Sequence, residues 1–432
     1  MRLVLCARKL LNTSTLILSA ALMSSAIEPY TISIPDSQLH DLNNRLDLAR
    51  FPDELDEAGW DLGAPLSDVQ RLTSYWRHTF NWRKAEQKLN RLPHFITSVQ
   101  VDGYENLKVH FLHKKSDRKG AVPLLFVHGW PGNFLEVTKI INGLTSTSEG
   151  QVSFDVVAPS LPNYGFSEGS KKRGFSQEQY AETLHKLMLR LGYNEYVTQG
   201  GDWGWYVTRT ISKLYPQHCK ATHFNMDVGA APTFLKNPLL AAEAALKPLS
   251  DRENQGISRT QWFDKEGFGY NLLQSTKPQT LGYGLTDSPV ALLAWIYEKL
   301  HDWTDNYPWT DEEVCTWLSI YWFSTAGPAA SCRIYYEMDR SGAWGERFTR
   351  DQLREWLPGV KIGYSHFPRD LHVLPSTWTR TLGTTVFEKE HASGGHFAAW
   401  ERPADIVADV REMFGKAGGA YGIVKGRDGY SP

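Results

Sequence analysis

The sequence predicts a protein of the α/β class, in which a doubly wound and mostly parallel sheet is interrupted by a helical insertion. Several short apolar segments are typical of strands buried on both faces of a sheet. They are residues 122–127, 154–158, 196–198, 221–224, 360–364 and 384–387. Helical patterns separate several of these segments, and such alternation favours right-handed βαβ units with helices on both faces of the sheet.

Size and composition agree with this class. A chain of 432 residues, 41% hydrophobic and 22% charged, has the composition of a globular protein. Its length corresponds to about three average domains, or to one α/β domain with insertions. The net charge of −2 gives no electrostatic basis for nucleic acid as the main partner. The four scattered cysteines predict neither a disulfide framework nor a zinc site.

The pattern divides most of the chain into a meander, a core and a lid. Residues 28–120 are predicted to form a meander of short helices that wraps the core. Residues 121–229 and 351–432 are predicted to form the α/β core. Residues 230–350 lose the strand–helix alternation and become helical and rich in aromatics, which indicates a lid over the strand ends. The clearest helical patterns are 37–48, 67–89, 177–191 and 205–215.

The first residues carry a pattern of their own. A basic start, a short apolar run at 16–23 and small residues after it are typical of a signal peptide or a membrane anchor within residues 1–27. A plain extension with neither role is the alternative, so a secretory or microsomal location and a cytoplasmic one both stay open. The run is too short to span a bilayer as a helix.

A strand, a tight turn and a helix meet at the first candidate catalytic residue. Asp202 stands in Gly-Gly-Asp-Trp-Gly, residues 200–204, directly after the strand predicted at 196–198. A glycine-flanked nucleophile on such a turn is the elbow of the α/β-hydrolase fold, here with Asp where esterases carry Ser. Glycines suit the cramped turn, and the helix N-terminus favours a carboxylate. An Asp that merely caps the helix is the alternative.

A second motif predicts the oxyanion hole. Residues 128–132 read His-Gly-Trp-Pro-Gly and follow the strand 122–127. In this fold one backbone N–H comes from the loop after that strand and the other from the residue after the nucleophile. The donors are therefore expected at Trp130 and Trp203, and Pro131 is expected to fix the loop, with a cis peptide bond as one option.

The base and its acid partner are expected late in the chain. His396 lies in a glycine-rich loop after the strand 384–387, which completes the order nucleophile, acid, histidine. Asp370 follows the strand 360–364 and is the expected charge partner of that imidazole. Asp227, at the end of an earlier strand, is the rival position.

Taken together, these segments resemble the epoxide hydrolases of the α/β-hydrolase fold, in particular the microsomal and juvenile-hormone type and its fungal relatives. The likeness covers nearly the whole chain after residue 28, and its motifs lie at 34–36, 49–52, 128–132, 160–162, 165–167, 200–204 and 394–403. The departures are small: Asn163 stands where relatives often have Gly, and Asp370 follows the fungal pattern where microsomal animal members often use Glu.

The resemblance implies that two lid tyrosines bind the epoxide oxygen. One lies in a Gly-Tyr element before Thr-Lys-Pro, which here is Tyr270. The other lies in an Arg-aliphatic-Tyr-x-Glu element, which here is Tyr335, with the adjacent Tyr336 as the alternative. The expected substrates are a small apolar epoxide and water. A homodimer and a membrane contact through the N-terminal segment both stay open.

The residues predict a two-step hydrolysis of an epoxide to a vicinal diol. A carboxylate with an ordinary pKa near ~3.9 is ionised at neutral pH, so Asp202 needs no base to attack the epoxide. The phenols of Tyr270 and Tyr335 are neutral proton donors for the opening ring. His396, held by Asp370, is then free to activate water against the ester. No metal or organic cofactor is expected.

Two other functions fit part of the pattern. A haloalkane dehalogenase shares the Asp nucleophile, but usually carries Asn where this loop has Trp130, and it needs no lid tyrosines. A non-catalytic ligand-binding protein on a hydrolase scaffold would have no use for a nucleophile, acid, base and oxyanion loop together. A serine esterase is excluded, because the elbow carries Asp202.

Overall fold

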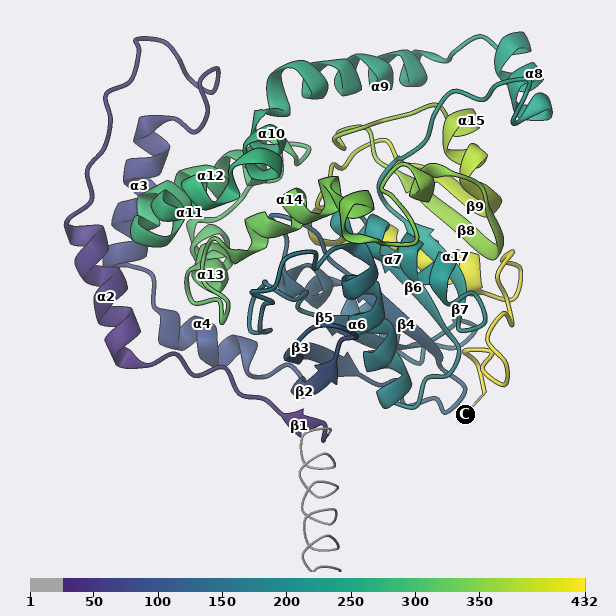
Figure 1. Cartoon of the computed structure of the whole chain (residues 1–432), viewed down its shortest axis with the longest axis horizontal. Helices are drawn as coiled ribbons and strands as arrows, with labels where there is room; N and C mark the ends of the chain where they lie inside the picture. Colours follow the sequence, from purple (N-terminus) through teal and green to yellow (C-terminus); the bar gives the residue numbers. More distant parts are fainter. Residues whose placement is uncertain (1–25, 432) are drawn as a thin grey trace, which may run out of the picture.

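A nine-stranded sheet forms the centre of the computed structural model, which describes residues 26–431 (Figure 1). The strands lie in the order β1-β2-β3-β5-β4-β6-β7-β8-β9. Their bounds are β1 Glu28–Pro29, β2 His94–Gln100, β3 Asn106–Lys114, β4 Val122–Val127, β5 Phe154–Pro159, β6 Tyr196–Gly200, β7 Cys219–Phe224, β8 Leu357–His366 and β9 Gly383–Glu390. From β5 to β9 all neighbours pair in parallel, which confirms the α/β class and the mostly parallel sheet.

The strand predictions succeed where the sequence is most apolar. Every residue of β4, β5 and β6 is buried. Strands covered on both faces need apolar side chains at every position, so they appear in the sequence as short unbroken runs. The six predicted segments coincide with β4 to β9, and the structure extends most of them by one to three residues at an end.

The antiparallel start of the sheet is a correction to the sequence analysis, which assigned only helices to residues 28–120. β2 and β3 form a hairpin, and β3 pairs antiparallel with β5. The hairpin buries histidines where apolar residues are usual, and these obscured the strand pattern. Their polarity is satisfied within the fold, because His94 Nδ1 lies 2.8 Å from His110 Nε2, and His110 Nδ1 lies 2.9 Å from Ser160 Oγ.

The helix predicted at 67–89 is also wrong as a single element. It is two helices, α3 (Leu66–His78) and α4 (Trp82–Leu89). The break lies at Asn81, whose side chain accepts a hydrogen bond from the Lys84 N–H at 3.1 Å and so starts a new helix.

Helices cover both faces of the sheet. α6 and α7 pack on each other, α7 packs over β4, β6 and β7, and α17 packs against α5, β8 and β9. The helices of this part are α5 Ile141–Thr145, α6 Gln177–Arg190, α7 Trp203–Leu214, α15 Ser376–Thr379, α16 Ala398–Glu401 and α17 Pro403–Phe414. Short 3-10 turns are η1 Phe134–Lys139, η5 Gln352–Arg354 and η6 Arg380–Leu382.

A helical segment separates β7 from β8 and lies above the sheet in Figure 1. Its elements are α8 Pro238–Leu246, α9 Asp251–Trp262, the π turn η2 Phe263–Gly267, α10 Gly269–Thr276, α11 Pro278–Asp287, α12 Pro289–Asp302, α13 Asp311–Trp322, η3 Ala330–Cys332, α14 Arg333–Asp339 and η4 Ser341–Trp344. We refer to α8–α14 as the lid helices. The division of the chain at residues 120, 229 and 350 stays an interpretation of the sequence.

The N-terminal helices brace the lid helices from outside. α2 (Asp36–Asp47) and α3 contact α12, and α3 and α4 contact α13. In Figure 1 they run along the side of the lid helices rather than over the sheet. The indole N–H of Trp76 in α3 donates to Ser319 Oγ in α13 at 3.1 Å. The meander therefore supports the part of the chain that carries the predicted tyrosines.

Membrane contact is predicted only for the start of the chain. Within residues 26–431, no helix is both long and apolar enough to cross a membrane. The targeting segment predicted within residues 1–27 lies, except for its last two residues, outside the described residues.

A fully buried arginine ties α7 to the last part of the sheet. Arg209 Nε donates to the carbonyl of Leu353 at 2.9 Å, and Nη2 donates to the carbonyls of Leu382, at 2.7 Å, and Glu355. Burial lowers the pKa of this guanidinium to about 10, so it stays charged at neutral pH. One cation thus satisfies three carbonyls around β8 and η6.

Replacing Arg209 with Met should lower the free energy of unfolding by about 3 kcal/mol, because three buried carbonyls lose charged donors. Urea denaturation followed by tryptophan fluorescence measures the change. Arg91→Met, at an exposed arginine, is the matched control and should change stability by less than about 0.5 kcal/mol. Equal effects of the two substitutions would contradict the assignment.

Candidate active site

The predicted nucleophile stands on a strained turn between β6 and α7. Asp202 has φ 51° and ψ −129°, a backbone conformation that costs a non-glycine residue about 1–3 kcal/mol. The turn closes only because its neighbours lack side chains: a Cβ at Gly204 would lie 2.0 Å from the Val127 carbonyl oxygen. The Asp202 side chain makes no capping hydrogen bond to α7, so the alternative of a simple helix cap is wrong.

The carboxylate of Asp202 is held by the loop after β4. The Trp130 N–H donates to Oδ1 at 2.7 Å. Gly129 makes room for this contact, since a Cβ there would lie 2.2 Å from the same oxygen. The backbone N–H groups of Trp130 and Trp203, the two predicted oxyanion donors, both lower the pKa of this carboxyl. The Trp130–Pro131 peptide bond is cis.

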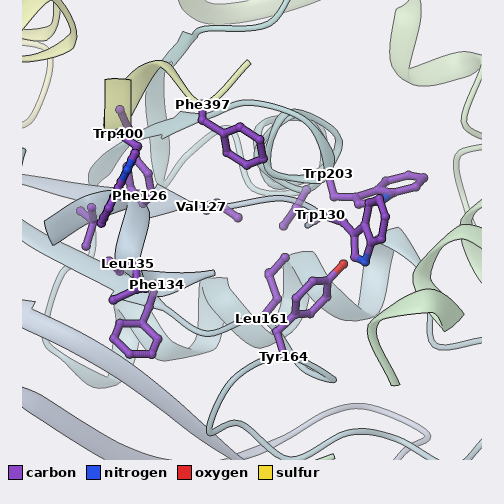
Figure 2. Close-up of a cluster of buried hydrophobic side chains, with 14 of the residues drawn as sticks. Phe126, Val127, Trp130, Phe134, Leu135, Leu161, Tyr164, Trp203, Phe397 and Trp400 are labelled. Carbon is purple, nitrogen blue, oxygen red and sulfur yellow. The ribbon is translucent and has the colours of Figure 1, made fainter. Parts of the chain in front are cut away.

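The lid fixes this loop from above. The Trp317 indole N–H in α13 donates to the Pro131 carbonyl at 2.6 Å, and the Tyr321 hydroxyl donates to the Gly132 carbonyl at 2.7 Å. Figure 2 shows the buried apolar cluster around the loop, which includes Trp130. The loop is therefore set by the lid helices as well as by the sheet.

The structure brings the predicted base and acid together with Asp202. His396 Nδ1 lies 2.7 Å from Asp370 Oδ1, and its Nε2 lies 3.6 Å from Asp202 Oδ2. Asp370 Oδ1 also accepts from the Leu371 N–H at 2.7 Å. The backbone N–H of His396 donates to the backbone carbonyl of Trp303 at 2.7 Å. His396 and Asp370 are buried and Asp202 is mostly buried, so their charges interact with little screening by water.

The rival acid Asp227 serves another histidine. Its Oδ1 lies 2.6 Å from His366 Nδ1, and its Oδ2 accepts from the Leu374 N–H at 3.1 Å. Glu388 Oε1 lies 3.1 Å from the other nitrogen of the same ring. Burial alone would lower the pKa of His366, but the two carboxylates outweigh it and raise that pKa to about 10.

Both predicted tyrosines face the nucleophile across a cavity of about 340 Å³. Tyr270 from α10 stacks on Trp130, with ring centroids 5.3 Å apart, and Tyr335 from α14 meets the edge of Trp203 at 4.8 Å. Tyr336 does not line this cavity; its hydroxyl accepts from an arginine at the surface. Of the two tyrosines between which the sequence did not decide, Tyr335 is therefore the one that lines the cavity.

The phenols of Tyr270 and Tyr335 are held in their neutral, protonated form. Burial raises the pKa of both Tyr270 and Tyr335, and the negative charge of Asp202 raises each further. Both phenols therefore stay protonated at neutral pH. The Tyr335 hydroxyl is buried and has no hydrogen-bond partner among the residues that the structure describes, which leaves its proton free for a bound molecule.

The nucleophile and base shift each other's protonation. Burial raises the pKa of Asp202, and His396 and the amides of Trp130 and Trp203 oppose this only in part. Burial lowers the pKa of His396, but Asp370, together with the other carboxyls, outweighs it and raises that pKa. The sequence analysis assumed an ordinary carboxyl pKa for Asp202, and this assumption is corrected: burial raises that pKa, and the hydrogen-bond donors and His396 oppose the rise.

Two largely buried glutamates near the imidazole were missed. Glu136, on η1, lines a small cavity with Asp202 and His396. Glu401 accepts from the N–H groups of Gly395, at 2.8 Å, and Asp305, at 2.9 Å, and so holds the histidine loop. Glu136 stands inside an apolar run and Glu401 at the end of one, each next to a predicted site motif, and that is the signal that could have revealed them.

No metal site accompanies these groups in the described part of the chain. Within residues 26–431, no set of three or more His, Cys, Asp or Glu side chains is arranged to hold a metal ion.

Asp202 lies at the start of α7 in a strained conformation, and His396, which follows the last strand, lies beside it. This arrangement on a mostly parallel sheet defines the protein as an α/β-hydrolase. The family model for the alpha/beta hydrolase fold matches residues 122–296. A second family model, described as the epoxide hydrolase N terminus, matches residues 27–137 and so covers the meander.

Similar proteins narrow the class to one family. A putative epoxide hydrolase of Stigmatella aurantiaca is 38% identical, over 90% of this chain and 84% of that protein. Epoxide hydrolase 1 of Sus scrofa is 33% identical, over 92% of this chain and 90% of its own length. The structure of Aspergillus niger epoxide hydrolase is 34% identical, with a TM-score of 0.77 over 90% of this chain and 95% of that chain. The chain belongs to the epoxide hydrolase family, which confirms the resemblance.

The pairing of His366 with Asp227 and Glu388 predicts a pH-dependent contribution to stability. The folded pKa of about 10 lies above the unfolded value near ~6.5. The stabilisation is therefore complete below about pH 6.5 and is lost as the pH rises toward 10. His366→Gln should lower the free energy of unfolding, and the loss should shrink by more than about 1 kcal/mol between pH 6 and pH 10.

Urea denaturation at both pH values measures this difference. His40→Gln, at an exposed histidine, is the control and should show no pH-dependent gap. A loss for His366→Gln that stays constant from pH 6 to pH 10 would mean that the imidazole is not charged in the folded protein.

Proposed function

We propose that this protein hydrolyses small apolar epoxides to vicinal diols through a covalent ester on Asp202. The observation that carries the proposal is the position of the Asp202 carboxylate, which contacts the loop amide and the imidazole and also lines the cavity that holds the two tyrosines. Asp202 Oδ1 is held by the Trp130 amide, and Oδ2 lies 3.6 Å from His396. The same side chain faces the cavity that Tyr270 and Tyr335 line.

In the first step Asp202 Oδ2 attacks an epoxide carbon from the side of the cavity opposite the two tyrosines. The carbon–oxygen bond of the ring breaks, and negative charge develops on the epoxide oxygen. The phenols of Tyr270 and Tyr335 lie on the opposite wall, where they donate to that oxygen. The products of this step are an ester on Asp202 and a neighbouring hydroxyl group.

In the second step water attacks the ester. His396 takes a proton from the water, and Asp370 stabilises the resulting imidazolium. The carbonyl oxygen becomes an oxyanion, which the Trp130 amide, already bonded to Oδ1, and the Trp203 amide stabilise. Each such donor contributes about 3 kcal/mol in comparable sites. The acyl bond then breaks and releases the diol, so the oxygen that leaves in the first turnover comes from Asp202.

The cavity favours a modest-sized epoxide over a haloalkane. Its volume of about 340 Å³ lies at the low end for ligand pockets, and much of its wall is aromatic. A departing halide accepts N–H bonds and takes no proton, whereas two protonated phenols above the carboxylate suit an oxygen leaving group. A homodimer, and a membrane contact through residues 1–27, stay predictions from the sequence alone.

Replacing His396 with Asn should stop the second step and leave the first. The imidazole is needed only to activate water, so its loss should slow ester hydrolysis by about 10²–10⁴-fold. Incubation with styrene oxide should then add one substrate mass to the intact protein. Peptide mapping should place that mass on Asp202.

The double substitution His396→Asn with Asp202→Asn is the control and should take up no label. A label on any other residue would contradict the proposed nucleophile. Failure of the wild-type protein to form a diol from a broad panel of epoxides would contradict the proposed activity itself.

Replacing the tyrosines should slow the first step instead. Tyr270→Phe and Tyr335→Phe should each lower the single-turnover rate of ester formation by about 10- to 100-fold, because one donor remains, and the double substitution should lower it by about 10⁴-fold. Rapid-quench mass spectrometry measures ester formation. Tyr336→Phe removes a neighbouring phenol outside the cavity and is the matched control; a defect as large as that of Tyr335→Phe would contradict the assignment.

A further inference from the structure

The carboxyl group of Glu136 lies inside the site, and no step above uses it. Its residue stands on η1, one turn after the loop that carries Trp130. Space for the carboxyl is made by Gly132, where a Cβ would lie 1.8 Å from Glu136 Oε1. The absence of a side chain at residue 132 therefore directs this acid inward, toward Asp202 and His396.

Asp202 separates two cavities of different size and character. The larger one carries the tyrosines. The smaller one lies on the other side and is lined by Glu136, Asp202 and His396 together with Gly129 and Asn225. Its volume of about 10 Å³ is what a single water molecule requires. Apolar side chains close the rest of its wall: Phe126, Val127, Phe397 and Ala399.

We propose that Glu136 binds the hydrolytic water in this small cavity and, together with His396, holds it against the carbonyl carbon of the Asp202 ester. The proposal rests on the function proposed above. A water there has two hydrogens to place, and two acceptors face it: the Nε2 atom of the imidazole and an oxygen of the Glu136 carboxyl. With both hydrogens bound, a lone pair of the water oxygen is left to point at the ester.

The protonation of Glu136 suits this position. Burial raises its pKa to about 8, and the charge of Asp202 adds to the rise, while His396 opposes it. The group is therefore mostly neutral at pH 7. A neutral carboxyl still accepts a hydrogen bond through its carbonyl oxygen. It also adds no negative charge beside the oxyanion that forms in the second step.

The atoms of the hydrolysis balance. The water oxygen bonds to Cγ of Asp202, and one of its protons passes to His396 Nε2. The bond between Cγ and the diol oxygen then breaks, and His396 returns its proton to that oxygen. The second proton of the water leaves the re-formed Asp202 carboxyl and replaces the one that the tyrosines donated in the first step. Glu136 orients the water and gains or loses nothing.

The test separates the two steps in single turnovers with styrene oxide. Glu136→Met keeps the size of the side chain but removes the acceptor, so ester hydrolysis should slow by about 10- to 100-fold while the ester on Asp202 accumulates. Glu136→Gln keeps a carbonyl acceptor and should stay within about fivefold of the wild-type hydrolysis rate. Rapid quench and intact-protein mass spectrometry follow both the formation and the loss of the ester.

A second substitution displaces the Glu136 carboxyl without changing residue 136 itself. Gly132→Ala places a methyl group where the Glu136 carboxyl lies and should displace it, so the ester should accumulate as in Glu136→Met. Thr138→Val, on the same η1 turn, removes a hydroxyl that bonds the Leu135 carbonyl at 2.7 Å. It is the matched control and should leave both rates as in the wild type.

Three outcomes would overturn the proposal. One is hydrolysis at the wild-type rate in Glu136→Met. Another is an equal loss of both steps, which indicates a structural role. The third is a Gln variant as slow as the Met variant, since a hydrogen-bond acceptor is then not what matters. Absence of any ester in the wild-type protein would instead contradict the function proposed for Asp202.

Discussion

The hydrogen bond from the Trp130 amide to Asp202 Oδ1 is the contact on which the whole site depends. An enclosed carboxylate resists ionisation, and only directed donors keep it charged. The protein supplies them by holding Asp202 in a strained backbone conformation beside a loop that ends in Pro131 and Gly132. The strain is tolerated because the glycines around the turn let β4 and α7 approach each other closely.

This contact couples distant parts of the chain. The loop is fixed by Trp317 and Tyr321 of α13, and α13 is in turn packed against α3 and α4 of the meander. A change on the outside of the N-terminal helices can therefore reach the carboxylate through the lid. The meander is for this reason part of the site's support, although it contributes no residue to the cavity.

The core of the fold and the chain order of the site were predictable, because both leave local patterns. Buried parallel strands appear as apolar runs, and the elbow appears as glycines around Asp202. The β2–β3 hairpin was not predictable in the same way, since the partners that satisfy His94 and His110, which include each other and Ser160, come together only in the folded chain. Glu136 was missed for a related reason: its meaning depends on the missing side chain at Gly132 and on His396, which lies 260 residues later in the chain.

The two cavities on either side of Asp202 suggest how one carboxylate can serve two opposite chemistries. In the proposed mechanism the first step needs a dry site, so that the carboxylate attacks carbon rather than being solvated, and it needs acids on the far wall. The second step needs one water and a base. A single open pocket would have to meet both demands at once. With Tyr270 and Tyr335 lining one cavity, and His396 and Glu136 the other, the proposed substrate can occupy the larger cavity without displacing the proposed hydrolytic water.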